Sequence, residues 1–106
     1  MAGIHFEWDE AKNLSNQRKH GISFEVAVRA FFDPLAVSVK ERIKDGEQRW
    51  QTFGLVDGFL LLLVAHTVRE VNEAGSQTES MRIISARPAT RKEKQRYEAE
   101  NRSFHT

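Results

Sequence analysis

The sequence predicts an α+β fold, in which two N-terminal helices and a C-terminal helix pack on one face of a mostly antiparallel sheet of four to five strands. Three observations predict this class. Apolar residues in 24–31 recur at helical spacing, whereas residues 35–68 hold three strand-like segments separated by turn residues. The motif TRKE at 90–93 has the composition of a helix start. With 106 residues, the chain should form a single domain over residues 1–106.

The N-terminal part of the chain predicts a short strand followed by a helix. Residues 6–9, FEWD, alternate apolar and polar side chains, which is the pattern of a half-buried strand. Asp9 can cap a helix over residues 10–19, and Gly21 suits the position after its end. This helix has only a thin apolar stripe, so we expect it to lie on the surface.

A second helix has the clearest pattern in the chain. Ser23 is an N-cap candidate, and it precedes apolar residues at the spacing of one buried helical face: Phe24, Ala27, Val28 and Phe31. Asp33 and Pro34 should end this helix, because proline disfavours the helical region for the residue before it.

Three strand-like segments fill the middle of the chain. The valine-rich residues 35–41 and residues 49–56 lie on either side of the turn-prone residues 44–46. Asp57-Gly58 is a strong hairpin signal. It leads into residues 59–68, whose near-continuous apolar run predicts a central strand that is buried on both faces.

The C-terminal third predicts a loop, a strand and a helix. The polar residues 70–80 include a glycine and should form a mobile loop. Residues 82–86 predict the last strand. Residues 90–93 fit a capping box that opens the final helix.

The composition of the chain argues against a membrane-spanning, a secreted or a cysteine-dependent protein. The hydrophobic fraction of 40% is typical of a globular domain, and no apolar run approaches the roughly 20 residues that span a bilayer. The N-terminal residues have neither the basic nor the apolar region of a secretory signal, so we expect a cytoplasmic protein without a membrane partner. The absence of cysteine excludes disulfides, thiol nucleophiles and thiolate metal sites.

Positive charge gathers at one strand-to-helix corner of a chain whose net charge is only +1. Residues 82–96 contain six Lys or Arg and one acid, Glu93. A solvated helix face with a few internal ion pairs is one explanation. However, Arg82 and Arg87 precede the helix, and cations are unfavourable near the positive end of a helix dipole. This placement favours a phosphate site, and therefore a nucleic-acid partner.

The histidines and one acid–base pair are further candidates. His66 shares a strand face with apolar residues and is most simply structural, although Arg69 follows it closely. Lys19 and His20 end the first helix, where cations interact favourably with the dipole. His5 and His105 lie near the termini and carry little weight.

Glu47 and Arg49 are two residues apart and should share a strand face. They form either a surface ion pair or a general base beside a phosphate clamp. Spacing alone leaves both interpretations open.

The remaining chemistry of the chain favours cleavage of RNA. The sequence has no metal-ligand motif, glycine-rich phosphate loop or nucleophile elbow. An enzyme built from His, Glu, Lys and Arg can use the 2′-hydroxyl of RNA as the nucleophile. The protein then supplies a base, an acid and charge stabilisation of the phosphate, with neither metal nor cofactor.

The chain resembles the BrnT family of type II toxins. The resemblance rests on these segments: FEWDEAKNLSNQRKHGISFEVA at 6–27, FFDPLA at 31–36, EQRWQTFG at 47–54, VAHTVRE at 64–70 and RIISARPATRKEKQRYE at 82–98. It implies a RelE-like fold and a ribonuclease that arrests growth. It also implies an antitoxin, BrnA, with a ribbon-helix-helix part, so that the toxin reaches DNA only indirectly.

The resemblance also carries over a set of charged residues. Those expected at the catalytic centre are His66, Glu47, Arg82, Arg87, Lys19 and His20, and those expected to bind RNA are Arg49, Arg69 and Arg91. We also expect the neighbouring Lys92 to bind RNA. We expect Arg82 and Arg87 to hold the scissile phosphate, with the base left open between His66, His20 and Glu47. The alternatives are an inactive module that binds RNA or antitoxin and a structural adaptor.

Overall fold

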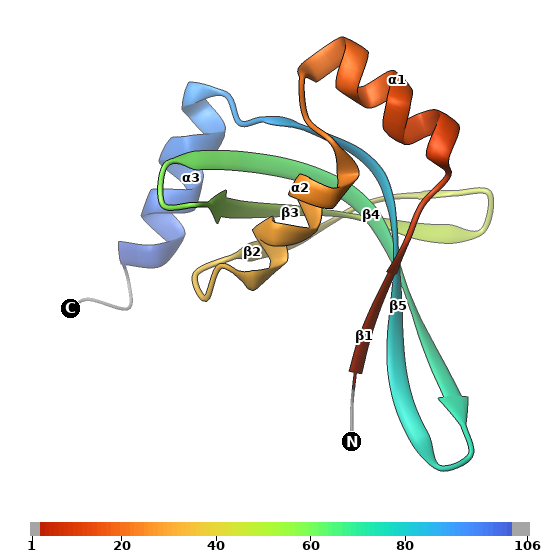
Figure 1. The fold of residues 1–106 in the computed structure, drawn as a ribbon. Helices are drawn as coiled ribbons and strands as arrows, with labels where there is room; N and C mark the ends of the chain where they lie inside the picture. Colours follow the sequence, from red (N-terminus) through yellow and green to blue (C-terminus); the bar gives the residue numbers. More distant parts are fainter. Residues whose placement is uncertain (1–2, 103–106) are drawn as a thin grey trace.

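The structure is a computed structural model that describes residues 3–102, and it contains a five-stranded sheet in the order β1-β5-β4-β3-β2. The strands are β1 (Gly3–Glu7), β2 (Val37–Lys44), β3 (Glu47–Val56), β4 (Leu60–Glu73) and β5 (Ser76–Pro88). The helices are α1 (Glu10–His20), α2 (Phe24–Val28), the 3₁₀ helix η1 (Arg29–Phe32) and α3 (Arg91–Arg102). β1 runs parallel to β5 and the other neighbours are antiparallel, which confirms the predicted α+β class (Figure 1).

The sheet is covered by helices on both faces. On one face, Leu62 and Val64 of β4 pack against α2 in the larger core. On the other face, Leu61 and Leu63 pack with Phe53 of β3 and with Tyr97 of α3. The expectation that all helices share one face is therefore wrong. Because β4 has apolar side chains on both faces of the sheet, helices must pack on both faces to bury them. This agrees with its predicted position as a central strand that is buried on both faces.

The β4–β5 hairpin replaces the predicted loop at residues 70–80, which is a second correction. β4 continues to Glu73 and β5 begins at Ser76, so Ala74 and Gly75 form the turn, with φ angles of 49° and 81°. Positive φ at both positions suits a two-residue hairpin turn. The outer part of this hairpin is largely exposed. Its residues are mostly polar, so the sequence lacks the apolar–polar alternation that predicts a strand. The hairpin extends beyond the rest of the sheet with β1 alongside (Figure 1).

Most local predictions are confirmed. Asp9 accepts hydrogen bonds from the first turn of α1, and Gly21 after that helix has a φ of 72°. Ser23 caps α2, but the predicted second helix continues beyond Val28 as the 3₁₀ helix η1. The first strand spans Gly3–Glu7, rather than residues 6–9.

Two buried asparagines attach α1 to the rest of the fold. Asn13 accepts a hydrogen bond from the backbone N–H of Phe24 at 2.8 Å and donates one to Glu25 at 2.9 Å. Asn16 donates to the backbone carbonyl of Ala86 at 2.7 Å and accepts from its N–H at 3.1 Å. Asn16 therefore satisfies the backbone of β5 beyond the last residue that β1 pairs.

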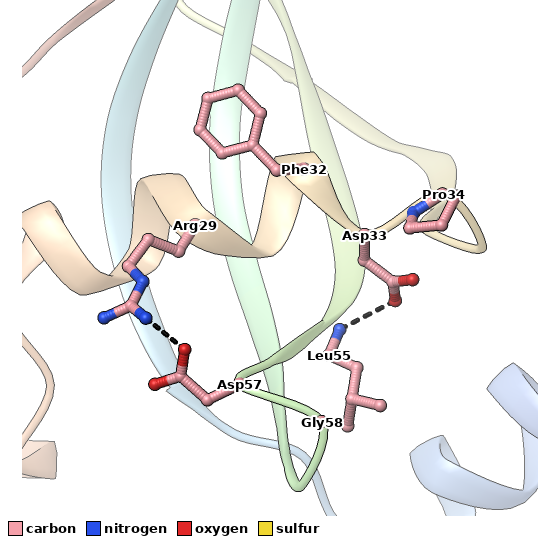
Figure 2. Close-up of a pocket in the computed structure, with 7 residues that line it drawn as sticks. All are labelled: Arg29, Phe32, Asp33, Pro34, Leu55, Asp57 and Gly58. Atoms are coloured by element: carbon pink, nitrogen blue, oxygen red, sulfur yellow. Dashed lines mark hydrogen bonds and ion pairs between the residues drawn. The ribbon is translucent and has the colours of Figure 1, made fainter.

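Asp33 joins η1 to both β3 and α3. Its carboxylate accepts a hydrogen bond from the N–H of Leu55 at 2.8 Å and one from the Tyr97 hydroxyl at 2.6 Å. Burial and the hydrogen bond to Asp33 raise the pKa of Tyr97. Figure 2 shows Asp33 beside the β3–β4 turn, where Arg29 forms an ion pair with Asp57.

In residues 3–102, no helix has both the length and the apolar character to cross a membrane.

Candidate active site

Charged side chains from four strands gather on the sheet face that α3 partly covers. Pairing between neighbouring strands sets Glu7, Arg82, Thr67 and Arg49 in one row across this face. Paired residues of neighbouring strands share a face, as do residues two apart on one strand. The surface is called the charged face here, and it consists of His5, Glu7, Glu47, Arg49, Thr67, Arg69, Ser80 and Arg82.

An ion pair between Arg82 and Glu47 lies at the centre of the charged face. One guanidinium nitrogen of Arg82 lies 2.6 Å from a carboxylate oxygen of Glu47. The pair reaches from β5 to β3 above β4. The two side chains are 49% and 39% exposed, so a solute can reach both groups. The structure therefore places a carboxylate and a guanidinium in direct contact at an open surface.

Two further arginines lie beside this pair. Arg49 is half-buried, and its Nε is buried without a hydrogen-bond partner in the described part of the chain. Buried polar atoms usually have partners, so this nitrogen marks Arg49 as a guanidinium group that the described residues leave partly unsatisfied. Arg69 is exposed and lines an open groove of about 520 Å³ with His5, Glu7 and Ser80. The charged face thus offers three guanidinium groups to an anion.

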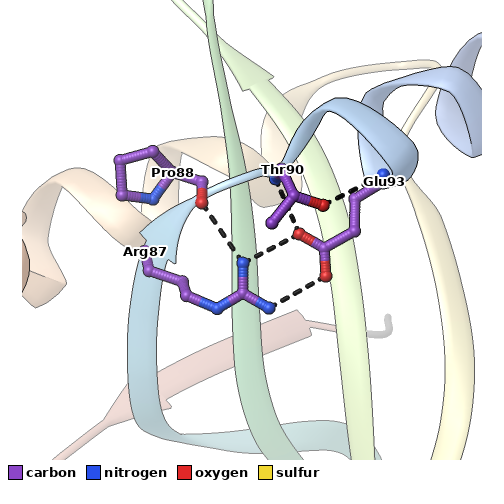
Figure 3. A network of polar contacts seen from close by, with 4 residues as sticks. All are labelled: Arg87, Pro88, Thr90 and Glu93. Atoms are coloured by element: carbon purple, nitrogen blue, oxygen red, sulfur yellow. Dashed lines mark hydrogen bonds and ion pairs between the residues drawn. The ribbon is translucent and has the colours of Figure 1, made fainter.

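Arg87 has a different environment (Figure 3). Its two terminal nitrogens each lie 2.8 Å from a carboxylate oxygen of Glu93. Glu93 also accepts a hydrogen bond from the N–H of Thr90 at 2.8 Å, and its own N–H donates to the Thr90 hydroxyl at 3.2 Å, which confirms the capping box. The hydrogen bond from Arg87 is the main cause that lowers the pKa of Glu93 to about 2. The anion expected at the start of α3 is therefore supplied by the chain itself.

The structure keeps Arg82 and Arg87 apart. Their partners on β4 are Thr67 and Leu63, which are four residues apart. At about 3.3 Å per residue, this corresponds to roughly 13 Å along the strand. Each arginine also has its own carboxylate partner. The geometry gives no support to the expectation that both arginines hold one phosphate. Arg82 is the one that lies on the same face as Arg49 and Arg69.

His66 lies on the opposite face of the sheet. It is 1% exposed, its Nε2 lies 2.7 Å from the Thr52 hydroxyl, and its ring packs edge-on against Phe31 at 4.8 Å between centroids. Burial lowers its pKa, and a hydrogen bond to the backbone of Thr67 opposes this only partly. A neutral, buried imidazole cannot contact a substrate on the charged face. The role expected for His66 in proton transfer is therefore corrected to a structural one.

The remaining candidates lie at the margins. Lys19 and His20 line a small hollow of about 180 Å³ at the edge of β5, beside a bulge next to Ser85. Arg91 and Lys92 are exposed in the first turn of α3, and neither has a hydrogen-bond or ion-pair partner within residues 3–102. These four residues are available to contact a long ligand, but the structure does not bring them to the Arg82–Glu47 pair.

Two other hollows flank the β3–β4 turn. One, of about 420 Å³, is lined by the Arg29–Asp57 pair, Phe32 and Pro34, so its cation is already neutralised (Figure 2). The other, of about 470 Å³, is mainly apolar, with Phe59 and Leu61 in its wall. Within the described residues, no group of three or more metal-ligating side chains gathers at any of these places.

A family of known proteins matches most of the chain. Residues 8–93 match the sequence model of a family described as "Ribonuclease toxin, BrnT, of type II toxin-antitoxin system". The chain belongs to this BrnT family. The crystal structure of the Brucella abortus ribonuclease toxin BrnT is similar, at 21% identity and a TM-score of 0.47, over 86% of this chain and 100% of that one. No curated protein matches.

Sequence analysis missed part of the charged face. The sequence predicts Glu47, Arg49, Arg69 and Arg82 as site residues, and they do lie together on this face. It gives little weight to His5, which lies near the N-terminus. The BrnT match also begins after it, at residue 8. The alternation in β1 is a signal that places His5 and Glu7 on one face. No pattern of neighbouring residues indicates that β1 pairs with β5. This pairing is what brings His5 and Glu7 close to Arg82. His105 lies outside the described residues.

The Arg87–Glu93 contact predicts an effect on stability that depends on pH. The pKa of Glu93 falls from an ordinary value of 4.5 to about 2. The contact therefore stabilises the fold fully above pH 4.5, and its contribution is lost as the pH falls towards 2. We expect Arg87→Ala to lower the free energy of unfolding by roughly 1–2 kcal/mol at neutral pH, since both groups are partly exposed.

Urea unfolding of the wild type and Arg87→Ala at several pH values checks this prediction. The difference between them should shrink steadily below pH 4.5. Arg91→Ala is the control, because Arg91 is exposed and has no ion-pair partner among residues 3–102. A difference that stayed constant across the acid range would contradict the assignment.

Proposed function

We propose that this chain is a ribonuclease toxin that cleaves RNA on the charged face without a metal ion. The observation that carries the proposal is the exposed contact between Arg82 and Glu47, with the unpartnered Nε of Arg49 and the exposed Arg69 beside it. One guanidinium group can donate two hydrogen bonds to two oxygens of the same phosphate. A carboxylate at the same place can accept a proton. Membership of a ribonuclease toxin family supports the same activity.

Glu47 acts as the general base in the proposed reaction. It takes the proton from the 2′-hydroxyl, and the 2′-oxygen then attacks the neighbouring phosphorus. Arg82 stabilises the charge that develops on the phosphate oxygens, while Arg49 and Arg69 hold the phosphate in place. The Arg82–Glu47 contact orients the carboxylate before RNA arrives. These reaction steps need no metal ion, because the arginines stabilise the charge on the phosphate.

A type II toxin acts together with an antitoxin, and we propose that this one is a BrnA-like protein with a ribbon-helix-helix part that contacts DNA. Arg69, Arg91 and Lys92 are exposed cations that an acidic antitoxin segment can cover. Charge complementarity of this kind speeds association. Coexpression with such an antitoxin should relieve growth arrest and yield a complex that does not cleave RNA. Cleavage by the purified complex at the rate of the free toxin would contradict this arrangement.

Incubation of the purified protein with bulk RNA in excess chelator tests metal independence. We expect degradation at the same rate with and without chelator, and products that end in 2′,3′-cyclic phosphates. Loss of cleavage in chelator and its return with added magnesium would overturn the mechanism. RNA binding without any cleavage, with or without magnesium, would instead favour an inactive binding module.

A further inference from the structure

His5 is the histidine that stands on the charged face. Among residues 3–102, His66 is buried on the opposite face, and His20 ends α1 at the edge of β5. His5 is exposed on β1 and pairs with Ser80 of β5, which in turn pairs with Arg69 of β4. The Cα pairing therefore places His5 one row along the sheet from Arg82.

The groove beside His5 runs along the β4–β5 hairpin, and Glu7, the β1 partner of Arg82, lines its wall. It has a volume of about 520 Å³, and His5, Arg69 and Ser80 line it together. The charged groups that line the groove with His5 are Glu7 on its own strand and Arg69 and Glu73 on β4, while the guanidinium of Arg82 reaches away from β1 to Glu47. Arg69 is therefore the guanidinium group that is placed to hold a phosphate close to the imidazole.

His5 and Glu47 approach the same point from opposite sides. Three strand spacings of about 4.8 Å separate the β1 and β3 backbones, or roughly 14 Å. The Arg82–Glu47 contact shows that side chains bridge two of these spacings above β4. Arg69 of β4 pairs with Ser80, the β5 partner of His5, and lies between β1 and β3, so a phosphate held by Arg69 lies between the imidazole and the carboxylate.

We infer that His5 is the general acid of the cleavage reaction, an inference that rests on the proposed function. Glu47 removes the 2′-hydroxyl proton, a bond forms between the 2′-oxygen and phosphorus, and the bond from phosphorus to the 5′-oxygen breaks. Protonated His5 delivers its proton to that leaving oxygen. The products are a 2′,3′-cyclic phosphate and a 5′-hydroxyl. Glu47 and His5 then return to their starting protonation states by exchange of one proton with solvent.

The groove gives this acid a defined substrate position. The nucleotide that leaves with the 5′-oxygen lies in the groove lined by His5 and Arg69, whereas the nucleotide that carries the 2′-hydroxyl lies towards Glu47 and Arg49. The direction of the RNA strand across the sheet follows from this assignment, with its 3′ portion over β1.

Cleavage kinetics of His5→Gln on two substrates test the inference. On a normal RNA dinucleotide, kcat/KM should fall about 100-fold or more, the usual contribution of a general acid. On the same dinucleotide with a 5′-bridging sulfur, whose leaving group needs no proton, His5→Gln should be as fast as the wild type.

Ile4→Gln is the matched control, because Ile4 is exposed on the other face of β1 and should leave both rates unchanged. A His5→Gln variant that cleaves the normal substrate at the wild-type rate would overturn the role of His5 but not the proposed function. So would a variant whose rate, relative to the wild type, is reduced as much on the sulfur substrate as on the normal one. A wild type that cleaves neither substrate would overturn the proposed function itself, and the inference with it.

Discussion

Arg82→Ala should cleave RNA about 100- to 1000-fold more slowly than the wild type. Arg82 is the guanidinium in direct contact with Glu47. In the proposed mechanism it contacts the phosphate most strongly when charge develops in the transition state. By analogy with the loss of an oxyanion donor, this corresponds to about 2.7–4 kcal/mol. Arg82→Lys should recover only part of the rate, because lysine keeps the charge and loses the two-pronged geometry.

Stability measurements separate this effect from misfolding. Arg82 is 49% exposed, so its replacement should change the free energy of unfolding by under about 0.5 kcal/mol. Arg102→Ala, at the exposed end of α3, is the control and should leave both cleavage and melting unchanged. Full activity in Arg82→Ala would refute the assignment, as would a fall in stability that parallels the fall in rate.

Gly54→Ala should destabilise the fold by roughly 3 kcal/mol or more, at the upper end of the range for overpacked cores. A Cβ atom at Gly54 would lie 2.0 Å from the carbonyl oxygen of Ala30 and 2.8 Å from its Cβ. η1 therefore packs directly on the backbone of β3, and neither backbone can move without disturbing the core. β3 also carries Glu47 and Arg49, so cleavage should be lost together with stability.

Thermal melting of Gly54→Ala and Gly3→Ala provides the comparison. Gly3 lies in β1, has no positive φ, and has nothing within 4 Å of an added Cβ. The Gly3 variant should melt within a few degrees of the wild type, whereas the Gly54 variant should be largely unfolded or insoluble. Equal melting temperatures for the two variants would show that the close approach of η1 to β3 is wrong.

The parts of the fold that sequence analysis predicts well are those with local causes. Asp9 and Ser23 cap the helices that follow them, and Asp57-Gly58 forms a hairpin turn, because these outcomes depend on a few neighbouring residues. The apolar run of β4 likewise indicates its central position without any knowledge of its partners.

The parts that it misses depend on contacts between distant segments. Tyr97 determines which side of the sheet α3 covers. It packs on β4, and its hydroxyl donates a hydrogen bond to Asp33, the residue that follows η1. The ion pair between Arg87 and Glu93 depends on how the end of β5 meets the start of α3. His5 gains its neighbours from a parallel pairing across more than 70 residues, for which a single sequence carries no local signal.

The central claim is that RNA binds on the charged face, and mapping the contact surface by nuclear magnetic resonance tests it most directly. Isotopically labelled protein would be titrated with a short RNA whose 2′-hydroxyls are methylated, so that it binds without being cleaved. The account predicts that amide signals shift on β3, β4 and β5 around Glu47, Thr67 and Arg82, while those of α2 stay unchanged. Shifts confined to α2 and the turn at Asp57 would contradict it.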